Sequence, residues 1–104
     1  MKEIKRGEIY AVDFGVGFGS EQGGIRPSLI LQNDIGNKHS PTTIVAAITG
    51  RKTKAALPTH VKIMAKGLKT ESTVLLEQIR TIPQGRGRTT RNRPRRSRND
   101  PPYI

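Results

Sequence analysis

Residues 19–34, GSEQGGIRPSLILQND, join a glycine-rich segment directly to a short apolar run. Five glycines between residues 15 and 25 predict a long connection, because glycine adopts turn conformations that other residues avoid. The apolar residues Leu29, Ile30 and Leu31 that follow indicate a β-strand over residues 27–33. Long loops in small domains usually carry function, so this junction is the first candidate region for a site.

The rest of residues 1–82 is a series of short apolar segments separated by turn residues, as is typical of an all-β domain. Tyr10, Val12 and Phe14 occupy alternate positions and so share one face of a strand. Residues 43–49 are almost continuously apolar, which indicates a central strand buried on both faces. Further strands are predicted over residues 8–14, 60–64 and 73–79, with one helical turn within residues 34–41. Five such strands predict a mainly-β fold, either a strongly curved antiparallel sheet or a small barrel.

The sequence of 104 residues is short for a domain and only 33% hydrophobic, with no Trp and two Phe. Small domains of this kind often gain burial from a partner subunit. Cysteine is absent and there are two histidines, which argues against a disulfide framework and a structural zinc site. We therefore expect no metal and no cofactor. The lack of an apolar run long enough for a signal peptide or a membrane span predicts a cytoplasmic protein without membrane contact.

The formal net charge of +11 points to a polyanionic partner such as RNA or DNA. Residues 83–104 contain seven arginines, one aspartate and four prolines, with only Tyr103 and Ile104 as apolar groups. Such a segment buries too little surface to offset the entropy of ordering. We therefore predict a compact domain over residues 1–82 and a disordered Arg/Pro-rich tail over residues 83–104. The tail is either an RNA-binding arm or a solvated appendage.

Several separated segments resemble the MazF/PemK toxin family. The loop and strand quoted above, with Arg26-Pro27 at their junction, are similar to the signature of that family. The resemblance continues, in the family's order and approximate spacing, through residues 40–42, 44–49, 57–61 and 75–82, and it is closest to the Gram-positive branch. After Ile82 the sequence departs from the family pattern, which continues into a charged amphipathic C-terminal helix. We expect that helix to be missing here.

The resemblance implies a small SH3-like barrel of five antiparallel strands that acts as a homodimer. It also implies the toxin of a type II toxin–antitoxin system, an endoribonuclease that cleaves single-stranded mRNA at a short specific motif. A cognate MazE-type antitoxin is expected to block it. The family's reaction needs no metal, because the 2′-hydroxyl of the RNA attacks the adjacent phosphate and leaves a 2′,3′-cyclic phosphate and a 5′-hydroxyl end.

Arg26 and Thr49 are the residues that the resemblance assigns to catalysis. This reaction needs cations or donors at the phosphate oxygens where charge develops, together with a base and an acid. The planar guanidinium of Arg26 suits a phosphate, and the resemblance makes it the electrostatic stabiliser and proton shuttle. The Thr49 hydroxyl is placed beside the same phosphate. From residue type alone, Arg26 has the alternative of a surface ion pair, and Thr49 that of an ordinary strand end.

Four more residues are candidate RNA contacts. Ser20 and Gln22 offer donors and acceptors to base edges, and Glu21 is the loop acid that orients Arg26 or accepts a proton. Each of the three has the alternative of capping the loop locally. Gln78, in the predicted last strand, is a candidate contact in the RNA groove, with a purely structural role as its alternative.

Two other functions stay open at this point: a non-catalytic RNA-binding β-barrel with a basic arm, and an inactive toxin remnant that still binds antitoxin. Arg26 and Thr49 within the full signature favour the enzyme, because a pure binder has no need of them. His60 is not taken as catalytic, although histidine titrates near neutral pH. A lone histidine at the start of a strand is more often structural or stacked on a base.

Overall fold

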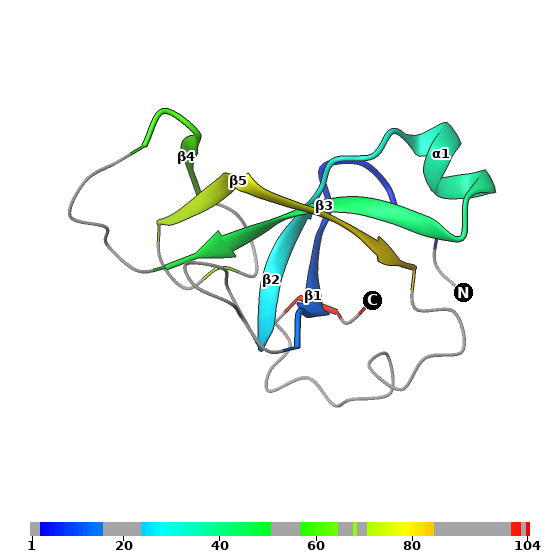
Figure 1. Cartoon of the computed structure of the whole chain (residues 1–104), viewed down its shortest axis with the longest axis horizontal. Helices are drawn as coiled ribbons and strands as arrows, with labels where there is room; N and C mark the ends of the chain where they lie inside the picture. Colours follow the sequence, from blue (N-terminus) through cyan, green and yellow to red (C-terminus); the bar gives the residue numbers. More distant parts are fainter. Residues whose placement is uncertain are drawn as a thin grey trace.

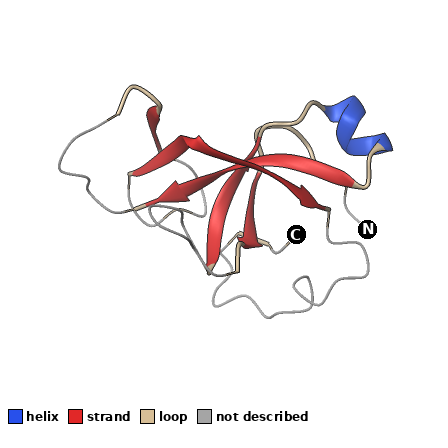
Figure 2. Cartoon of the chain, viewed as in Figure 1, coloured by secondary structure: helices blue, strands red, loops and turns tan. Residues whose placement is uncertain are grey.

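The computed structural model describes residues 3–15, 24–50, 57–64, 68, 71–84, 101, 102 and 104. They form β1 (Ile9–Asp13), β2 (Ile25–Ile30), α1 (Asp34–His39), β3 (Thr42–Thr49), β4 (His60–Ile63) and β5 (Ser72–Pro83), as Figures 1 and 2 show. The strands make one sheet in the order β1-β2-β3-β5-β4, and every neighbouring pair is antiparallel. This confirms the predicted mainly-β, five-stranded antiparallel fold. In Figure 1, β1 and β2 run across the direction of β3 and β5, so the sheet is strongly curved.

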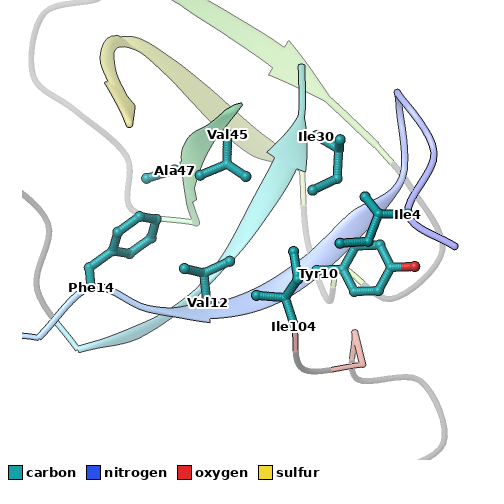
Figure 3. Packing of buried hydrophobic residues seen from close by; sticks show 8 residues of the cluster. All are labelled: Ile4, Tyr10, Val12, Phe14, Ile30, Val45, Ala47 and Ile104. Atoms are coloured by element: carbon teal, nitrogen blue, oxygen red, sulfur yellow. The ribbon is translucent and has the colours of Figure 1, made fainter. Parts of the chain in front are cut away.

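β3 is the central strand and is buried on both sides. Val45 and Ala47 point to one side and Ala46 and Ile48 to the other, and all four are at most 2% exposed. The first side belongs to the core cluster of Figure 3, which contains Ile4, Tyr10, Val12, Phe14, Ile30, Val45, Ala47 and Ile104. The second side packs with Val74 and with the partly buried Ile9, Leu29, Leu31, Ile63, Leu68 and Leu76. Burial on two sides explains why this segment is almost entirely apolar.

Two strands differ from the sequence-based prediction by more than one residue at an end, and β2 also ends at Ile30 rather than at residue 33. β2 begins at Ile25 rather than at residue 27, because Ile25 and Arg26 already pair with β1, Arg26 opposite Val12. β5 continues to Pro83 instead of ending at residue 79, because it stays paired with β3 until Thr42 lies opposite Pro83. Both extensions depend on pairing with distant strands, which a local pattern does not record.

The polar segment after β2 forms the predicted helical turn, α1. Asn33 caps it by accepting a hydrogen bond from the Gly36 N–H at 2.7 Å. Asn37 is fully buried, and its side-chain oxygen accepts from the Thr43 hydroxyl at 2.6 Å and from Gln32 Nε2 at 3.1 Å. These bonds fix α1 to β3. At six residues, the one helix among the described residues is too short to cross a membrane.

Three residues of the predicted tail over residues 83–104 contact the rest of the domain, namely Gln84, Pro102 and Ile104. The disorder of the tail as a whole stays a prediction. Gln84 is buried, and its side-chain amide donates to two backbone carbonyls at the end of α1, each at 2.8 Å. Pro102 and Ile104 lie along β1, where they exchange backbone hydrogen bonds with Ala11. The low apolar content of the segment did not predict these contacts, because they depend on single residues, Gln84 at one end and Ile104 at the other. The prediction that the family's C-terminal helix is missing concerns residues 85–100 and 103, which lie outside the described residues, and it stays a prediction.

Candidate active site

Backbone hydrogen bonds join the two ends of the glycine-rich loop just before β2. The Phe14 N–H donates to the Gly24 carbonyl at 2.9 Å, and the Gly24 N–H donates to the Gly15 carbonyl at 2.6 Å. Gly15 and Gly24 have φ angles of 69° and 73°, in the left-handed region that favours glycine. The loop is therefore anchored two residues before Arg26. Outside the described residues lie the predicted loop contacts Ser20, Glu21 and Gln22, whose roles stay predictions.

Arg26 lies within β2 rather than in the loop. Alternate residues of a strand share one face, and Ile30 of β2 belongs to the first core cluster. Arg26 therefore faces the same side as that cluster, at the outer end of the strand and opposite Val12. It is half-buried. The residue before a proline favours extended backbone, so Pro27 helps to hold Arg26 in the strand.

Thr49 is the last residue of β3 and, by alternation, faces the same side as Ala47. The β2–β3 register ends with Ser28 opposite Ala47. Continued by two residues beyond this last pair, the same register would bring Arg26 opposite Thr49. The hydrogen-bonded ladder itself stops at Ser28, because Pro27 has no N–H to donate toward β3. Arg26, near the start of β2, and Thr49, at the end of β3, thus lie on one face of the sheet at the same end of two neighbouring strands.

The two side chains differ in exposure. Thr49 is only 3% exposed and pairs with Thr73 of β5, whereas Arg26 is half-buried. Arg26 is therefore the more solvent-accessible side chain of the two. Thr49 is held in a buried position at the end of β3.

The chain matches, over residues 5–98, the family described as PemK-like, MazF-like toxin of type II toxin-antitoxin system. It belongs to the PemK/MazF toxin family. The matched segment extends past Ile82, where the sequence was expected to depart from the family pattern. This PemK/MazF chain is 59% identical over 85 residues to endoribonuclease EndoA of Bacillus subtilis (strain 168), a match that covers 80% of this chain and 73% of that protein.

Two solved structures are similar to the PemK/MazF chain over most of its length. MazF from Deinococcus radiodurans has a TM-score of 0.67 at 25% identity, covering 86% of this chain and 77% of that one. An endoribonuclease in complex with its cognate antitoxin from a mycobacterial species has a TM-score of 0.60 at 25% identity, covering 78% and 69%. Both support the assignment of the fold.

A second arginine of the PemK/MazF chain lies on the same face and was not among the predicted site residues. Arg80 of β5 is opposite Val45, and its guanidinium carbon lies 5.0 Å from the ring centroid of Phe14, a cation–π geometry. Arg80 Nη1 also donates to the Phe14 carbonyl at 3.5 Å. Phe14 comes just before the glycine-rich loop, so Arg80 adds positive charge at the base of that loop. Arg80 lies just beyond the strand predicted over residues 73–79, so the sequence pattern did not assign it to a face of the sheet.

Gln78 lies where the pairing of β5 with β3 is irregular. The register shifts between Ala46, opposite Ile79, and Ile48, opposite Val74. Gln78 falls inside that shift and is partly buried. Irregularities of this kind re-aim side chains, so its direction is not fixed by simple alternation. The shift lies within a few residues of Thr49, which puts Gln78 near the same end of β3.

His60 is paired with Glu77, away from Arg26. His60 Nε2 and Glu77 Oε2 are 2.9 Å apart, and the Thr59 hydroxyl donates to the other carboxylate oxygen at 2.9 Å. Partial burial raises the pKa of Glu77, but hydrogen bonds from its own backbone, His60 and Thr59 together hold that pKa below the ordinary value of 4.5. β3 and β5 lie between His60 on β4 and Arg26 on β2. The pair therefore ties β4 to β5 and is separate from the candidate site.

Within the described ranges, no group of three or more His, Asp or Glu side chains is placed to hold a metal ion. The predicted independence from metal therefore stays a prediction that cleavage in a chelator can test.

Proposed function

We propose that the chain is a sequence-specific endoribonuclease toxin that cleaves single-stranded mRNA without a metal ion. Family membership and 59% identity to a protein named endoribonuclease support the activity. The observation that carries the proposal is the placement of Arg26 and Thr49 at the ends of neighbouring strands, on one face and beside the glycine-rich loop.

In the proposed reaction, the 2′-oxygen of the RNA bonds to the adjacent phosphorus, and the bond from phosphorus to the 5′-oxygen of the next nucleotide breaks. The 2′-hydroxyl gives up its proton, with the Glu21 carboxylate as candidate acceptor, and the leaving 5′-oxygen takes up a proton through Arg26. The Arg26 guanidinium and the Thr49 hydroxyl stabilise charge on the non-bridging oxygens. The products are a 2′,3′-cyclic phosphate and a 5′-hydroxyl end.

Base recognition is assigned to polar groups of the glycine-rich loop and of β5. Ser20 and Gln22 in the loop and Gln78 on β5 offer donors and acceptors to unstacked bases. Arg80, near the base of the loop, adds positive potential along the path of the phosphates. The half-buried arginines thus hold the backbone, while the amides and hydroxyl read the sequence.

We further propose a cytoplasmic homodimer that a MazE-type antitoxin inhibits. Leu57, Val61 and Met64 are 49%, 45% and 71% exposed and lie on or beside β4, at an edge of the sheet. Exposed apolar side chains grouped in this way favour an association surface. The complex of an endoribonuclease with its cognate antitoxin among the structural relatives supports an antitoxin partner. Light scattering of the purified chain tests the dimer, and a monomer mass would contradict it.

Cleavage of a mixed-sequence single-stranded RNA in EDTA tests the activity. We expect the wild-type chain to cut it and leave 2′,3′-cyclic phosphate ends. Arg26→Ala should lose about 10³-fold or more in rate, with RNA affinity at most modestly weakened, because the guanidinium acts mainly on transition-state charge. Arg6→Ala, which changes an exposed arginine in the turn before β1, is the matched control and should cleave normally.

Each other outcome of this assay has a definite meaning. Full inhibition by EDTA would contradict the metal-independent reaction. RNA binding without cleavage by the folded wild-type chain would identify the non-catalytic RNA-binding barrel. Neither binding nor cleavage, with antitoxin still bound, would identify the inactive remnant.

A further inference from the structure

β1 is an edge strand, and the chain's own last residues pair with its outer side. The Ala11 N–H donates to the Pro102 carbonyl at 2.8 Å, and the Ile104 N–H donates to the Ala11 carbonyl at 3.1 Å. The Phe14 N–H, just after β1, donates instead to the Gly24 carbonyl on the β2 side, so by alternation the Val12 amide also faces β2. Ala11 thus has both backbone groups satisfied at an edge that would otherwise face solvent.

The Ile104 side chain enters the first core cluster. It is 7% exposed, and Figure 3 shows it beside Val12 and Tyr10, pointing into the cluster that also contains Ile4. One pair of main-chain bonds and one buried aliphatic side chain are the two components of peptide recognition by strand addition. The main-chain bonds supply affinity, and the apolar recess selects the side chain.

The occupant and its site come from opposite ends of the sequence. The site consists of the Ala11 backbone with Ile4, Tyr10 and Val12, all within the first twelve residues, whereas its occupant begins after residue 100. Pro101 and Pro102 favour extended backbone, so the occupant loses little conformational entropy when it binds. The prolines also lack N–H groups, but the observed pairing uses only the Pro102 carbonyl and the Ile104 N–H.

We propose that the outer edge of β1 is a peptide-binding site for an extended segment with an aliphatic side chain, and that the segment containing Pro102 and Ile104 is its resident ligand. Occupation of this site leaves β1 closed to pairing with another chain. The same peptide added in trans should bind whenever the resident segment is displaced.

Hydrogen exchange on the full chain tests the pairing. Ile104→Lys cannot bury its side chain, so the Ala11 amide should exchange roughly tenfold faster or more. The Val12 amide, which faces β2, should keep its protection, and this separates local release from global unfolding. Ile104→Val is the conservative control and should leave Ala11 protected. If Ile104→Lys exposes Val12 as well, Ile104→Ala takes its place in the same comparison. Unchanged exchange at Ala11 in the variant would overturn the proposal.

Peptide binding tests the site itself. The peptide NDPPYI, which has the sequence of residues 99–104, should restore Ala11 protection in the Ile104→Lys chain with saturable dependence on concentration. The same peptide carrying Ile104→Lys should have no effect. The wild-type chain should respond little, because its tethered segment has a high effective concentration. Equal action of the two peptides, or failure of both, would show that no side-chain recess exists at this edge.

Discussion

Replacing Thr49 by valine and by serine separates the catalytic role of its hydroxyl from its contribution to the fold. Thr49 is 3% exposed and sits in β3 opposite Thr73. Valine keeps the volume and the β-branched shape and removes the hydroxyl. Serine keeps the hydroxyl and removes one methyl group. Thr49→Val therefore tests the hydroxyl, and Thr49→Ser tests the packing of the methyl group.

Their expected stability costs are similar. Loss of one hydrogen bond of a buried hydroxyl costs about 0.5–1.5 kcal/mol. Loss of one buried methyl group costs about 0.8 kcal/mol of transfer free energy and about 1–1.5 kcal/mol with the cavity included. For a chain of this size, either change should lower the melting temperature by roughly 4–8 °C. Neither variant should be unfolded at an assay temperature well below that transition.

Their expected cleavage rates differ. Removing one preorganised donor from a charged transition state costs about 10²–10³-fold, so Thr49→Val should lose that much in kcat/KM. Thr49→Ser should stay within roughly tenfold of the wild-type chain, because its donor remains. Initial rates on a fluorogenic single-stranded RNA, with folding checked by circular dichroism at the same temperature, measure both. Equal rates for the two variants would remove the hydroxyl from the mechanism, since their matched stability leaves no other cause.

Three further predictions test the rest of the chain. The pKa of Glu77 lies below 4.5 in the folded chain, so the hydrogen bonds of its carboxylate stabilise the fold above the unfolded-state pKa. This stabilisation is lost as pH falls through the folded-state pKa. Glu77→Gln should therefore flatten the pH dependence of the urea midpoint over that acidic range. Asn37→Leu leaves the buried Thr43 hydroxyl without its acceptor and should cost about 2–4 kcal/mol of unfolding free energy. Adding Thr43→Val should recover part of this loss, and strictly additive losses of the two variants would contradict their shared hydrogen bond. Replacing the seven arginines between residues 86 and 98 by glutamine should reduce the log–log salt slope of RNA binding by roughly 0.7 per lost contact, with the cleavage motif unchanged, and an unaltered slope would exclude those arginines from the RNA.

Substitution tests these arginines better than truncation after Ile82. Truncation would also remove Gln84, whose side-chain amide holds the end of α1, and Ile104, which is buried in the first core cluster. A truncated chain would therefore lose stability and charge together.

The strands and their faces were predictable because their signals are local. Tyr10, Val12 and Phe14 do share one face in the first core cluster, and the apolar run of residues 43–49 is buried on both sides. The extent of the strands was less predictable. Arg26 was assigned to the exit of the loop, although the residue before a proline favours extended backbone, and it pairs with Val12 in β2. Contacts between the two ends of the chain, such as Ile104 in the core, leave no periodic signal in the sequence.

The candidate site lies where the regular pairing of the sheet breaks down, and this limits what a sequence can reveal of it. A regular ladder uses every backbone N–H and C=O and fixes side chains by alternation. One break was visible in the sequence, because Pro27 cannot continue the β2–β3 ladder toward Arg26. The other, the register shift of β5 beside Ala47, has no such signal, since it arises where β5 passes from pairing with β3 alone to pairing also with β4. The residue types of Arg26, Thr49 and Gln78 were therefore predictable candidates, whereas the relation of Gln78 to the other two depends on an irregularity that only the folded sheet defines.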